Sequence, residues 1–190
     1  MYDHYTDYET VGQNKLALTR YYNSFSNPDT YAITMGQNWR SNYDRYLHFV
    51  SANYINVERM DGQVVSFSSS SGIWSTDTDI DLKLSSSGSN WLLTDPNDTV
   101  ETYFTSAGKG LLSSIALRNG YTQTLSYASG SVSKVTDSYG RSLSLSYSSS
   151  TGMLTGVTTP DTLALTYGYT LYSSANTYKL CMATPMHCQS

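Results

Sequence analysis

The feature that most constrains this chain is a repeated pattern of an aliphatic residue, a turn signal and an aromatic residue. In each repeat the turn signal follows the aliphatic residue by four to six positions, and the aromatic residue lies ten or twelve positions after the start. Because two strands that pair locally need a turn between them, each repeat predicts a β-hairpin. The five segments are Val57–Phe67, Leu93–Tyr103, Ile115–Tyr127, Val135–Tyr147 and Val157–Tyr167.

The turn signals contain residues that tolerate a positive φ angle. Asn-Gly and Asp-Gly pairs supply the positive φ angles of a type I′ turn, which matches the right-handed twist of paired strands. We therefore predict structural turns at Asp61-Gly62, at Asn119-Gly120 and at Gly140, with the first two of type I′. The last segment departs from the pattern, because Pro160-Asp161 stands where glycine is expected.

An alternating strand pattern follows each turn. For example, Leu143, Leu145 and Tyr147 alternate with serines. Because successive side chains of a strand point to opposite faces, one face of the predicted sheet is apolar and aromatic and the other is mostly hydroxylated. The aromatic residues at the ends of the hairpins predict a stacked ladder in the core. Its predicted members are Phe67, Tyr103, Tyr127, Tyr147 and Tyr167.

Length and composition agree with a β-rich fold. The chain has 190 residues, which suits one domain or a piece of a larger repeat array. Charged residues make up 14%, whereas Tyr occurs 18 times, so polarity comes mainly from uncharged side chains. We predict an all-β fold in which antiparallel β-hairpin repeats form a curved open sheet or a partial spiral shell. Its predicted parts are N-terminal capping strands over residues 1–50, hairpin repeats over 51–172 and a non-repeat tail over 173–190.

Charge and hydropathy exclude two common classes of partner. The net charge is −4 and the pI is about 5.2, so the overall charge attracts neither nucleic acid nor anionic lipid headgroups. No stretch reaches the roughly 18 apolar residues that a membrane helix needs. Residues 1–5 lack the basic start and the apolar core of a signal peptide. We therefore expect no nucleic-acid partner, no membrane insertion and no secretory signal within the chain.

One segment carries the densest side-chain information in the chain. It contains Trp39, Arg40, Tyr43, Asp44 and Arg45, and two interpretations stay open. In the first, the rings form a glycan platform, and Asp44 and Arg45 bond to sugar hydroxyls. In the second, which we favour, Trp39 and Tyr43 pack in the core and Arg40 pairs with Asp44. The segment then caps the first open edge of the sheet, because an uncovered edge promotes aggregation.

Few residues suggest catalysis. The chain lacks Gly-x-Ser-x-Gly, His-Glu-x-x-His, a phosphate-binding glycine loop and Cys-x-x-Cys. Asp77, Asp79 and Asp81 form the best carboxylate cluster, which on one side of a strand would hold calcium or supply a glycosidase acid and base. Leu82 stands where an EF-hand loop needs glycine, so we favour a solvated strand edge. We predict no catalytic residue, no metal site and no cofactor.

The two cysteines lie together at the end of the chain. Cys181 and Cys188 can close only a small terminal loop, so they do not staple the body of the fold. With His187 they offer at most three soft metal ligands, and we favour an incidental or disulfide-forming tail.

Several motifs together resemble Rhs/YD-repeat proteins, a family of large polymorphic toxins and related surface proteins. The first are Leu18-Thr-Arg20-Tyr21-Tyr22-Asn23-Ser24, Gly36-x-x-Trp39-Arg40-x-x-Tyr43-Asp44 and Arg59-x-Asp61-Gly62. The others are Asp98-Thr-Val-Glu101-Thr-Tyr103, Arg118-Asn119-Gly120 and Val135-Thr-Asp137-x-x-Gly140-Arg141. The resemblance covers roughly residues 7–170. It implies a hairpin sheet that, in full-length members, spirals into a hollow shell around a C-terminal toxic or unfolded cargo. The repeat consensus is degenerate after Tyr147, where Ser-Ser-Ser-Thr-Gly152 lacks the Asp and the Arg.

The resemblance sets the expected function. We expect a non-catalytic structural shell or scaffold module of a secreted or delivered bacterial protein, located outside the cell or on its surface. Its expected partners are the remainder of a larger repeat shell or further copies of itself. The first alternative is a glycan-binding or adhesive module, and the second is a self-assembling β filament whose open edges pair between copies. The third is a carbohydrate-active enzyme that uses Asp77, Asp79 or Glu101.

Overall fold

The structure is a computed structural model that describes residues 1–25, 34–172, 177–182 and 187–188. These residues form antiparallel strands and turns, with no helix among them. Accordingly, no helix in the described part is long and apolar enough to cross a membrane. The strands form one three-stranded and one fifteen-stranded sheet, and the larger sheet does not close on itself. The predicted all-β class with an open antiparallel sheet is thereby confirmed.

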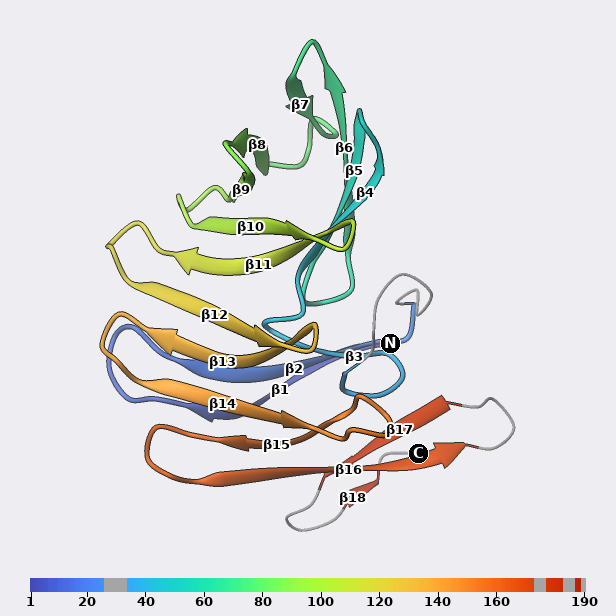
Figure 1. Cartoon of the computed structure of the whole chain (residues 1–190), viewed down its shortest axis with the longest axis vertical. Coiled ribbons are helices and arrows are strands. Elements are labelled where there is room, and N and C mark those ends of the chain that lie inside the picture. Colours follow the sequence, from blue (N-terminus) through green and yellow to red (C-terminus); the bar gives the residue numbers. More distant parts are fainter. Residues whose placement is uncertain (26–33, 173–176, 183–186, 189–190) are drawn as a thin grey trace.

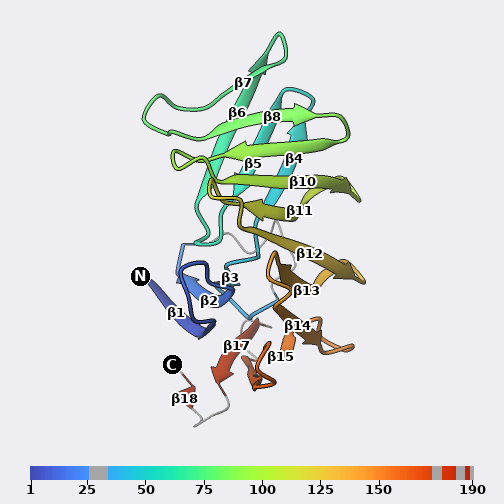
Figure 2. The same ribbon diagram turned by 90° about the vertical axis from the view of Figure 1, so that its left-hand side faces the viewer.

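The small sheet is built from the N-terminal part of the chain. It contains β1 (Tyr2–Glu9), β2 (Ala17–Asn23) and β3 (Trp39–Ser41), in that order. Figures 1 and 2 show it as a separate layer beside the lower hairpins of the large sheet. Leu16, Leu18 and Trp39 are buried and belong to the same apolar cluster as the inward-facing residues of the large sheet. The two sheets therefore share one core.

The large sheet holds all the remaining strands, and its first strand begins a few residues before the predicted boundary at residue 50. They are β4 (Tyr46–Ser51), β5 (Tyr54–Glu58), β6 (Val64–Ser70), β7 (Ile73–Ser75), β8 (Lys83–Ser87), β9 (Asn90–Thr94), β10 (Val100–Ser106), β11 (Lys109–Ala116), β12 (Thr122–Ala128), β13 (Ser131–Asp137), β14 (Ser142–Tyr147), β15 (Leu154–Thr158), β16 (Ala164–Tyr172), β17 (Thr177–Met182) and β18 (His187–Cys188).

The large sheet divides at β11. One edge of β11 pairs with β10, whereas the other edge pairs with β4 through Lys109–Leu111 and with β12 through Ser114–Ala116. From this strand, β4 to β7 rise steeply and β12 to β16 stack below as an arc of hairpins (Figure 1). Gly110 permits the close approach of β4, because a Cβ atom there would lie 2.7 Å from Cβ of Leu47.

Five hairpin turns share one hydrogen-bond pattern. In each, the amide of the fourth residue donates to the carbonyl of the first at 2.9 to 3.0 Å, and the first amide donates to the carbonyl of the fifth residue. The fourth residue always has a positive φ angle. This is the three-residue loop in which a type I turn precedes a left-handed residue. The left-handed residues are Gly62, Asp98, Gly120, Gly140 and Thr162.

Asn119-Gly120 therefore does not form the type I′ turn that we predicted, and neither does Asp61-Gly62. A type I′ turn needs positive φ at both central residues, but Asn119 and Asp61 lie outside the positive-φ region. In the last hairpin, Thr162 takes the place of glycine, whereas Pro160-Asp161 lies in the type I part of the turn. Proline fits there because its fixed φ suits the second residue of a type I turn.

Type I′ geometry occurs instead at the opposite ends of three hairpins. Ser71-Gly72, Ala107-Gly108 and Ser129-Gly130 each have two consecutive positive φ angles. These pairs join β6 to β7, β10 to β11 and β12 to β13. Ser or Ala before glycine thus forms this turn without an Asn or Asp. The rule that assigns type I′ turns to Asn-Gly and Asp-Gly pairs therefore selected the turns at the wrong end of the hairpins.

The predicted aromatic ladder divides into two rows of side chains. One row lies five positions after the left-handed turn residue and contains Phe67, Tyr103 and Tyr167. The other lies seven positions after it and contains Tyr127, Tyr147 and Tyr169. The predicted residues thus lie in the core or against it, but they do not form a single ladder. Tyr169, and not Tyr167, repeats Tyr147, and Thr162 marks the turn before it without a glycine signal.

Tyrosines of the second row close the splayed ends of three hairpins. In β11-β12, β13-β14 and β15-β16, the strands pair at three positions next to the turn and then separate. The hydroxyls of Tyr127, Tyr147 and Tyr169 bridge these gaps by donating to the carbonyls of Leu112, Val132 and Leu154, each at 2.8 Å. Splaying at one end with pairing at the other gives the arc its fan shape (Figure 1).

In three strand pairs, a β-bulge in one strand lies opposite a tyrosine of the other strand. The registers of β10-β11, β12-β13 and β14-β15 shift beside Tyr103, Tyr127 and Tyr147. A hydroxyl from each extra residue donates to a carbonyl of the facing strand, so the polar groups of the bulge find partners across the strand pair. The extra residues are Ser113, Ser133 and Thr155, with donor–acceptor distances of 3.0, 3.2 and 3.1 Å.

The segment predicted as a non-repeat tail extends the sheet. β17 pairs with β16 at six positions, from Tyr167 opposite Met182 to Tyr172 opposite Thr177. β18 then places Cys188 opposite Cys181. The open edge predicted at the last hairpin is therefore covered by the chain itself in the described residues.

Candidate functional site

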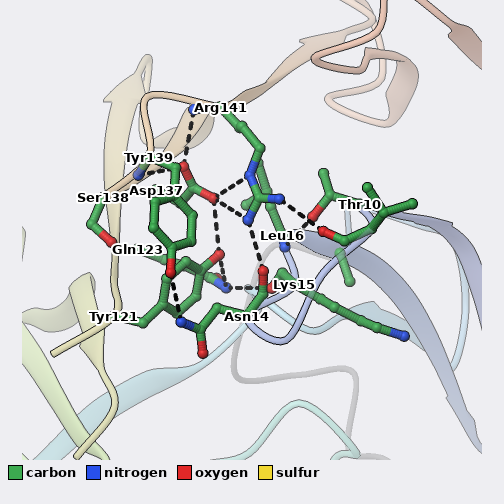
Figure 3. Close-up of polar contacts among 12 residues, drawn as sticks. Thr10, Asn14, Lys15, Leu16, Tyr121, Gln123, Asp137, Ser138, Tyr139 and Arg141 are labelled. Atoms are coloured by element: carbon green, nitrogen blue, oxygen red, sulfur yellow. Dashed lines mark hydrogen bonds and ion pairs between the residues drawn. The ribbon is translucent and has the colours of Figure 1, made fainter. Parts of the chain in front are cut away.

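An extended network of polar contacts joins the β1-β2 loop to the turns of two hairpins (Figure 3). The loop is closed at its base, where Thr10 N donates to Leu16 O at 3.0 Å and Leu16 N donates to Thr10 Oγ1 at 2.9 Å. Closure of the base leaves the loop carbonyls between these residues free of strand pairing. The loop thereby offers backbone acceptors to the hairpins beside it.

Arg141 takes two of these acceptors. Its Nη2 donates to Asn14 O at 2.8 Å, and its Nη1 donates to Val11 O at 3.2 Å. The third side of the guanidinium faces Asp137, which accepts from Nε at 2.7 Å. Arginine suits this position because its planar group presents several donors in fixed directions. One side chain thus joins its own turn to the N-terminal sheet.

Asp137 orients Arg141 and also holds the turn. Its Oδ1 accepts from the amides of Tyr139 and Arg141 at 3.0 and 2.9 Å, and its Oδ2 accepts from Tyr121 Oη at 3.1 Å. Burial alone would raise the pKa of Asp137, but the hydrogen bonds from Arg141, Tyr121 and the turn amides lower it. The carboxylate is therefore held in its charged form.

The neighbouring turn contacts the same loop through neutral side chains. Asn119 Nδ2 donates to Asn14 Oδ1 at 2.9 Å, and Asn14 Nδ2 in turn donates to Tyr139 Oη at 2.9 Å. Gln123 Nε2 donates to Lys15 O at 3.2 Å. Two successive hairpins are thereby attached to one loop.

The third hairpin reaches the same sheet through β1. Tyr167 Oη donates to Asp7 Oδ2 at 2.7 Å, and Arg20 binds both oxygens of Asp7 at 2.6 and 2.9 Å. Burial, followed by the nearby Asp7 charge, raises the pKa of Tyr167, so its hydroxyl stays protonated and donates. Arg20 also lies over the Trp39 ring, 5.0 Å from its centroid. Arg20 thus connects the apolar core to the last hairpin.

The end of the arc is attached through the segment before β3. Thr34 O accepts from Leu154 N at 2.6 Å, and Gln37 N donates to Tyr178 O at 2.8 Å. Gly36 has a φ angle of 86°, and a Cβ atom there would lie 2.9 Å from Tyr178 O. Only glycine combines this backbone conformation with so close an approach. The N-terminal part thereby contacts β15 and β17 as well as the turns.

A second buried cluster joins the segment before β4 and the β5-β6 turn to β10. Glu101 on β10 accepts from Arg59 Nη1 and Nη2 at 2.7 and 2.9 Å, and it is also bonded to Arg45 and Tyr103. Burial alone would raise the pKa of Glu101, but the two guanidinium groups and Tyr103 lower it to about 2. This carboxylate is permanently charged at neutral pH, so it is a poor general acid.

The predicted Trp39 to Arg45 segment is mostly buried. Trp39 is 9% exposed and Tyr43 is 1% exposed, so neither ring offers a face to a ligand. Arg40 pairs with Glu58 at 2.8 Å and not with Asp44, which corrects the predicted ion pair. Asp44 instead accepts from Ser41 N and Ser41 Oγ at 2.7 and 2.8 Å and closes the turn after β3.

The carboxylate cluster is not on a strand. Asp77, Asp79 and Asp81 are exposed and lie in the irregular link between β7 and β8, where Ile80 N donates to Asp77 O at 3.0 Å. The predicted strand edge is therefore wrong, because the chain turns here and the side chains do not line one face. Across the residues that the structure describes, no group of three acidic, His or Cys side chains could hold a metal ion.

Comparison with known proteins gives one finding for the N-terminal part. Residues 1–67 match the family model of a domain of unknown function, DUF6531, a domain often found in Rhs/YD-repeat proteins. The matched range spans the small sheet, β4, β5 and the first part of β6. The chain matches no curated protein.

The sequence does not mark the β1-β2 loop as the centre of these contacts. Residues 11–15 have no predicted role, because their partners lie more than a hundred positions away. The one local signal of the site is Asp137-x-x-Gly140-Arg141, which the sequence marks by its resemblance to Rhs/YD repeats and not by a predicted contact.

Proposed function

We propose that this chain is a non-catalytic structural module of a secreted or delivered bacterial Rhs/YD-repeat protein. In this role the N-terminal sheet caps the beginning of a hairpin shell and holds its first hairpins in place. In the complete protein, further repeats would continue the shell around a C-terminal cargo, outside the cell or on its surface.

One observation carries the proposal. Arg141 in a repeat turn binds Val11 O and Asn14 O of the N-terminal loop, while Asp137 of the same turn fixes the guanidinium. Through this contact, which we call the clamp, the small sheet would hold the repeat turns in place. The match of residues 1–67 to a domain often found in Rhs/YD-repeat proteins supports the same role.

The state of the carboxylates supports a module without catalysis of its own. Both oxygens of Glu101 are occupied by Arg59, and the Asp77 cluster is open to solvent in a turn. A general acid needs a pKa near the working pH, whereas the pKa of Glu101 is lowered to about 2.

Hydrogen exchange of the intact chain tests the clamp. Arg141→Gln removes the charged contacts to the loop and to Asp137, so we expect faster exchange in β1, β2 and the β13-β14 turn together. Arg118→Gln is the matched control, because Arg118 also lies in a repeat turn but is 80% exposed and pairs only loosely with Asp98 at 3.3 Å. Unchanged exchange in β1 and β2 of the Arg141 variant would show that the contact does not hold the cap.

A glycan array with the intact chain tests the adhesive alternative. The scaffold role predicts no binding, because Trp39 and Tyr43 are buried. Saturable binding of a defined glycan would replace the scaffold role by an adhesive one.

A further inference from the structure

The chain contains a single Asn-Gly pair, and it lies within the contact between the arc and the β1-β2 loop. Asn119 is exposed, and Gly120 is the left-handed residue of its turn, with φ of 86°. Both polar atoms of the Asn119 side-chain amide are hydrogen-bonded. Its Nδ2 donates to Asn14 Oδ1 at 2.9 Å, and its Oδ1 accepts from Tyr121 N at 3.0 Å.

We propose that Asn119 is a site of spontaneous deamidation, and that docking of the β1-β2 loop slows the reaction. In the first step the backbone nitrogen of Gly120 loses its proton and forms a bond to Asn119 Cγ. The Cγ–Nδ2 bond then breaks, and ammonia leaves. Water opens the resulting cyclic imide at either carbonyl, which gives aspartate or isoaspartate. The reaction needs water and no oxidant or enzyme. Gly120 favours it because no Cβ atom shields the attacking nitrogen.

The docked turn restrains each atom that takes part in the first step. The Gly120 amide donates to Leu117 O at 2.9 Å, which directs the nucleophile away from the side chain. The leaving Nδ2 is held by Asn14, and Oδ1 is held by the Tyr121 amide. Attack therefore requires local opening of the turn, and its rate follows the population of the open state.

The product would loosen the contact between the β1-β2 loop and the turn of the β11-β12 hairpin. A carboxylate presents only acceptors toward Asn14 Oδ1, where the amide had offered a donor. Isoaspartate also adds a methylene group to the backbone of a turn that closes with a fixed number of residues. Modification of Asn119 would thus convert a docked β1-β2 loop into an undocked one, and the reverse change would not occur. The inference depends on the geometry of this turn alone, so its test is independent of the scaffold role.

Peptide mapping of the intact protein during incubation at neutral pH tests the site. Mass spectrometry follows the replacement of NH2 by OH, and labelling by an isoaspartyl methyltransferase detects the isomer. Asn97 is an internal control, because it occupies the same position of the same type of turn but precedes Asp98. We expect product at Asn119 and none at Asn97 over the same period. Equal rates at the two positions would overturn the proposal.

Two variants separate the site from its restraint. Asn14→Ala frees Nδ2 of Asn119 and is expected to raise deamidation at Asn119 several-fold, with the melting curve as the check that the protein stays folded. Asp98→Gly creates a second Asn-Gly pair without a docked loop, so Asn97 in this variant should react faster than Asn119 in the unmodified chain. If Asn14→Ala leaves the rate at Asn119 unchanged and Asn97 of the Asp98→Gly variant reacts no faster than Asn119 of the unmodified chain, the loop does not restrain the reaction and the proposed role of docking is wrong.

Discussion

The N-terminal part of the molecule and the hairpin arc are held by different kinds of contact. The part from β1 to β10 contains buried ion pairs, namely Arg20 with Asp7, Arg40 with Glu58, and Arg45 and Arg59 with Glu101. The arc from β12 to β16 contains the Arg141–Asp137 ion pair and otherwise repeats one turn, one bulge hydroxyl and one tyrosine hydroxyl from hairpin to hairpin.

The difference teaches where each part is vulnerable. A buried ion pair concentrates its energy in one contact, and the loss of one partner leaves a charge without compensation. Repeated neutral contacts spread the energy over similar units, so each one contributes less. Single substitutions should therefore cost more in the N-terminal part than in the arc.

The largest effect is expected for Glu101→Ala. The substitution leaves Arg45 and Arg59 buried without their shared carboxylate, which should lower the free energy of unfolding by about 3–5 kcal/mol. Urea unfolding monitored by Trp fluorescence measures this change. Glu9→Ala is the matched control, because Glu9 forms an exposed ion pair with Lys15 and should change stability little. A loss smaller than that caused by Tyr147→Phe in the arc would break the comparison.

Acid should act on the same cluster. The folded-state pKa of Glu101 is about 2, below its ordinary value of 4.5. Its contribution to stability is therefore complete above pH 4.5 and is lost as the pH falls toward about 2. The loss amounts to about 3 kcal/mol at 1.36 kcal/mol per pKa unit. Unfolding free energies measured through this range should fall in the unmodified chain and fall less in Glu101→Gln, whose side chain does not titrate.

A smaller effect is expected for Tyr147→Phe in the arc. The variant leaves Val132 O without its donor at the splayed end of β13-β14, which should cost about 1–3 kcal/mol. Thermal melting gives the change, and Tyr54→Phe, at a 39% exposed position, serves as the reference. If both variants melt alike, the hydroxyl does not close the hairpin.

The smallest effect is expected for Thr162→Gly, and it has the opposite sign. Thr162 is β-branched and has a φ angle of 67°, so glycine should relieve strain and stabilise the chain by about 1 kcal/mol. The reverse change, Gly140→Thr, introduces the same strain in an otherwise similar turn and should destabilise by a similar amount. Melting midpoints that move in the same direction for both variants would contradict the common turn geometry.

The arc could be predicted largely from the sequence because its signals are local. Alternation of Leu and Tyr with Ser located β14, and glycines located the turns at Gly120 and Gly140. The turn type was mispredicted because the dipeptide rule does not distinguish a glycine in a type I′ turn from a glycine that follows a type I turn. Burial of Trp39 and Tyr43 agrees with the capping interpretation of that segment.

The candidate site could not be predicted because its contacts join residues that are distant in sequence. Arg40 has Asp44 four positions away, yet β5 brings Glu58 closer, and no local pattern distinguishes the two acids. The β1-β2 loop acts mainly through its backbone carbonyls, which every residue has, and through the Asn14 side chain, so no sequence pattern marks its role. Tyr169 was missed for a third reason, since the turn before it lacks glycine.

The tyrosine bridges also have a consequence for how such a chain changes in length during evolution. Each bridge spans one splayed hairpin and begins a fixed number of residues after the turn, so the unit that can be copied or lost is a whole hairpin. Removal of a single strand would reverse the direction of every later strand and carry the tyrosines to the wrong end of the fan. Natural variants of the arc should therefore differ by even numbers of strands, with small insertions confined to the turns.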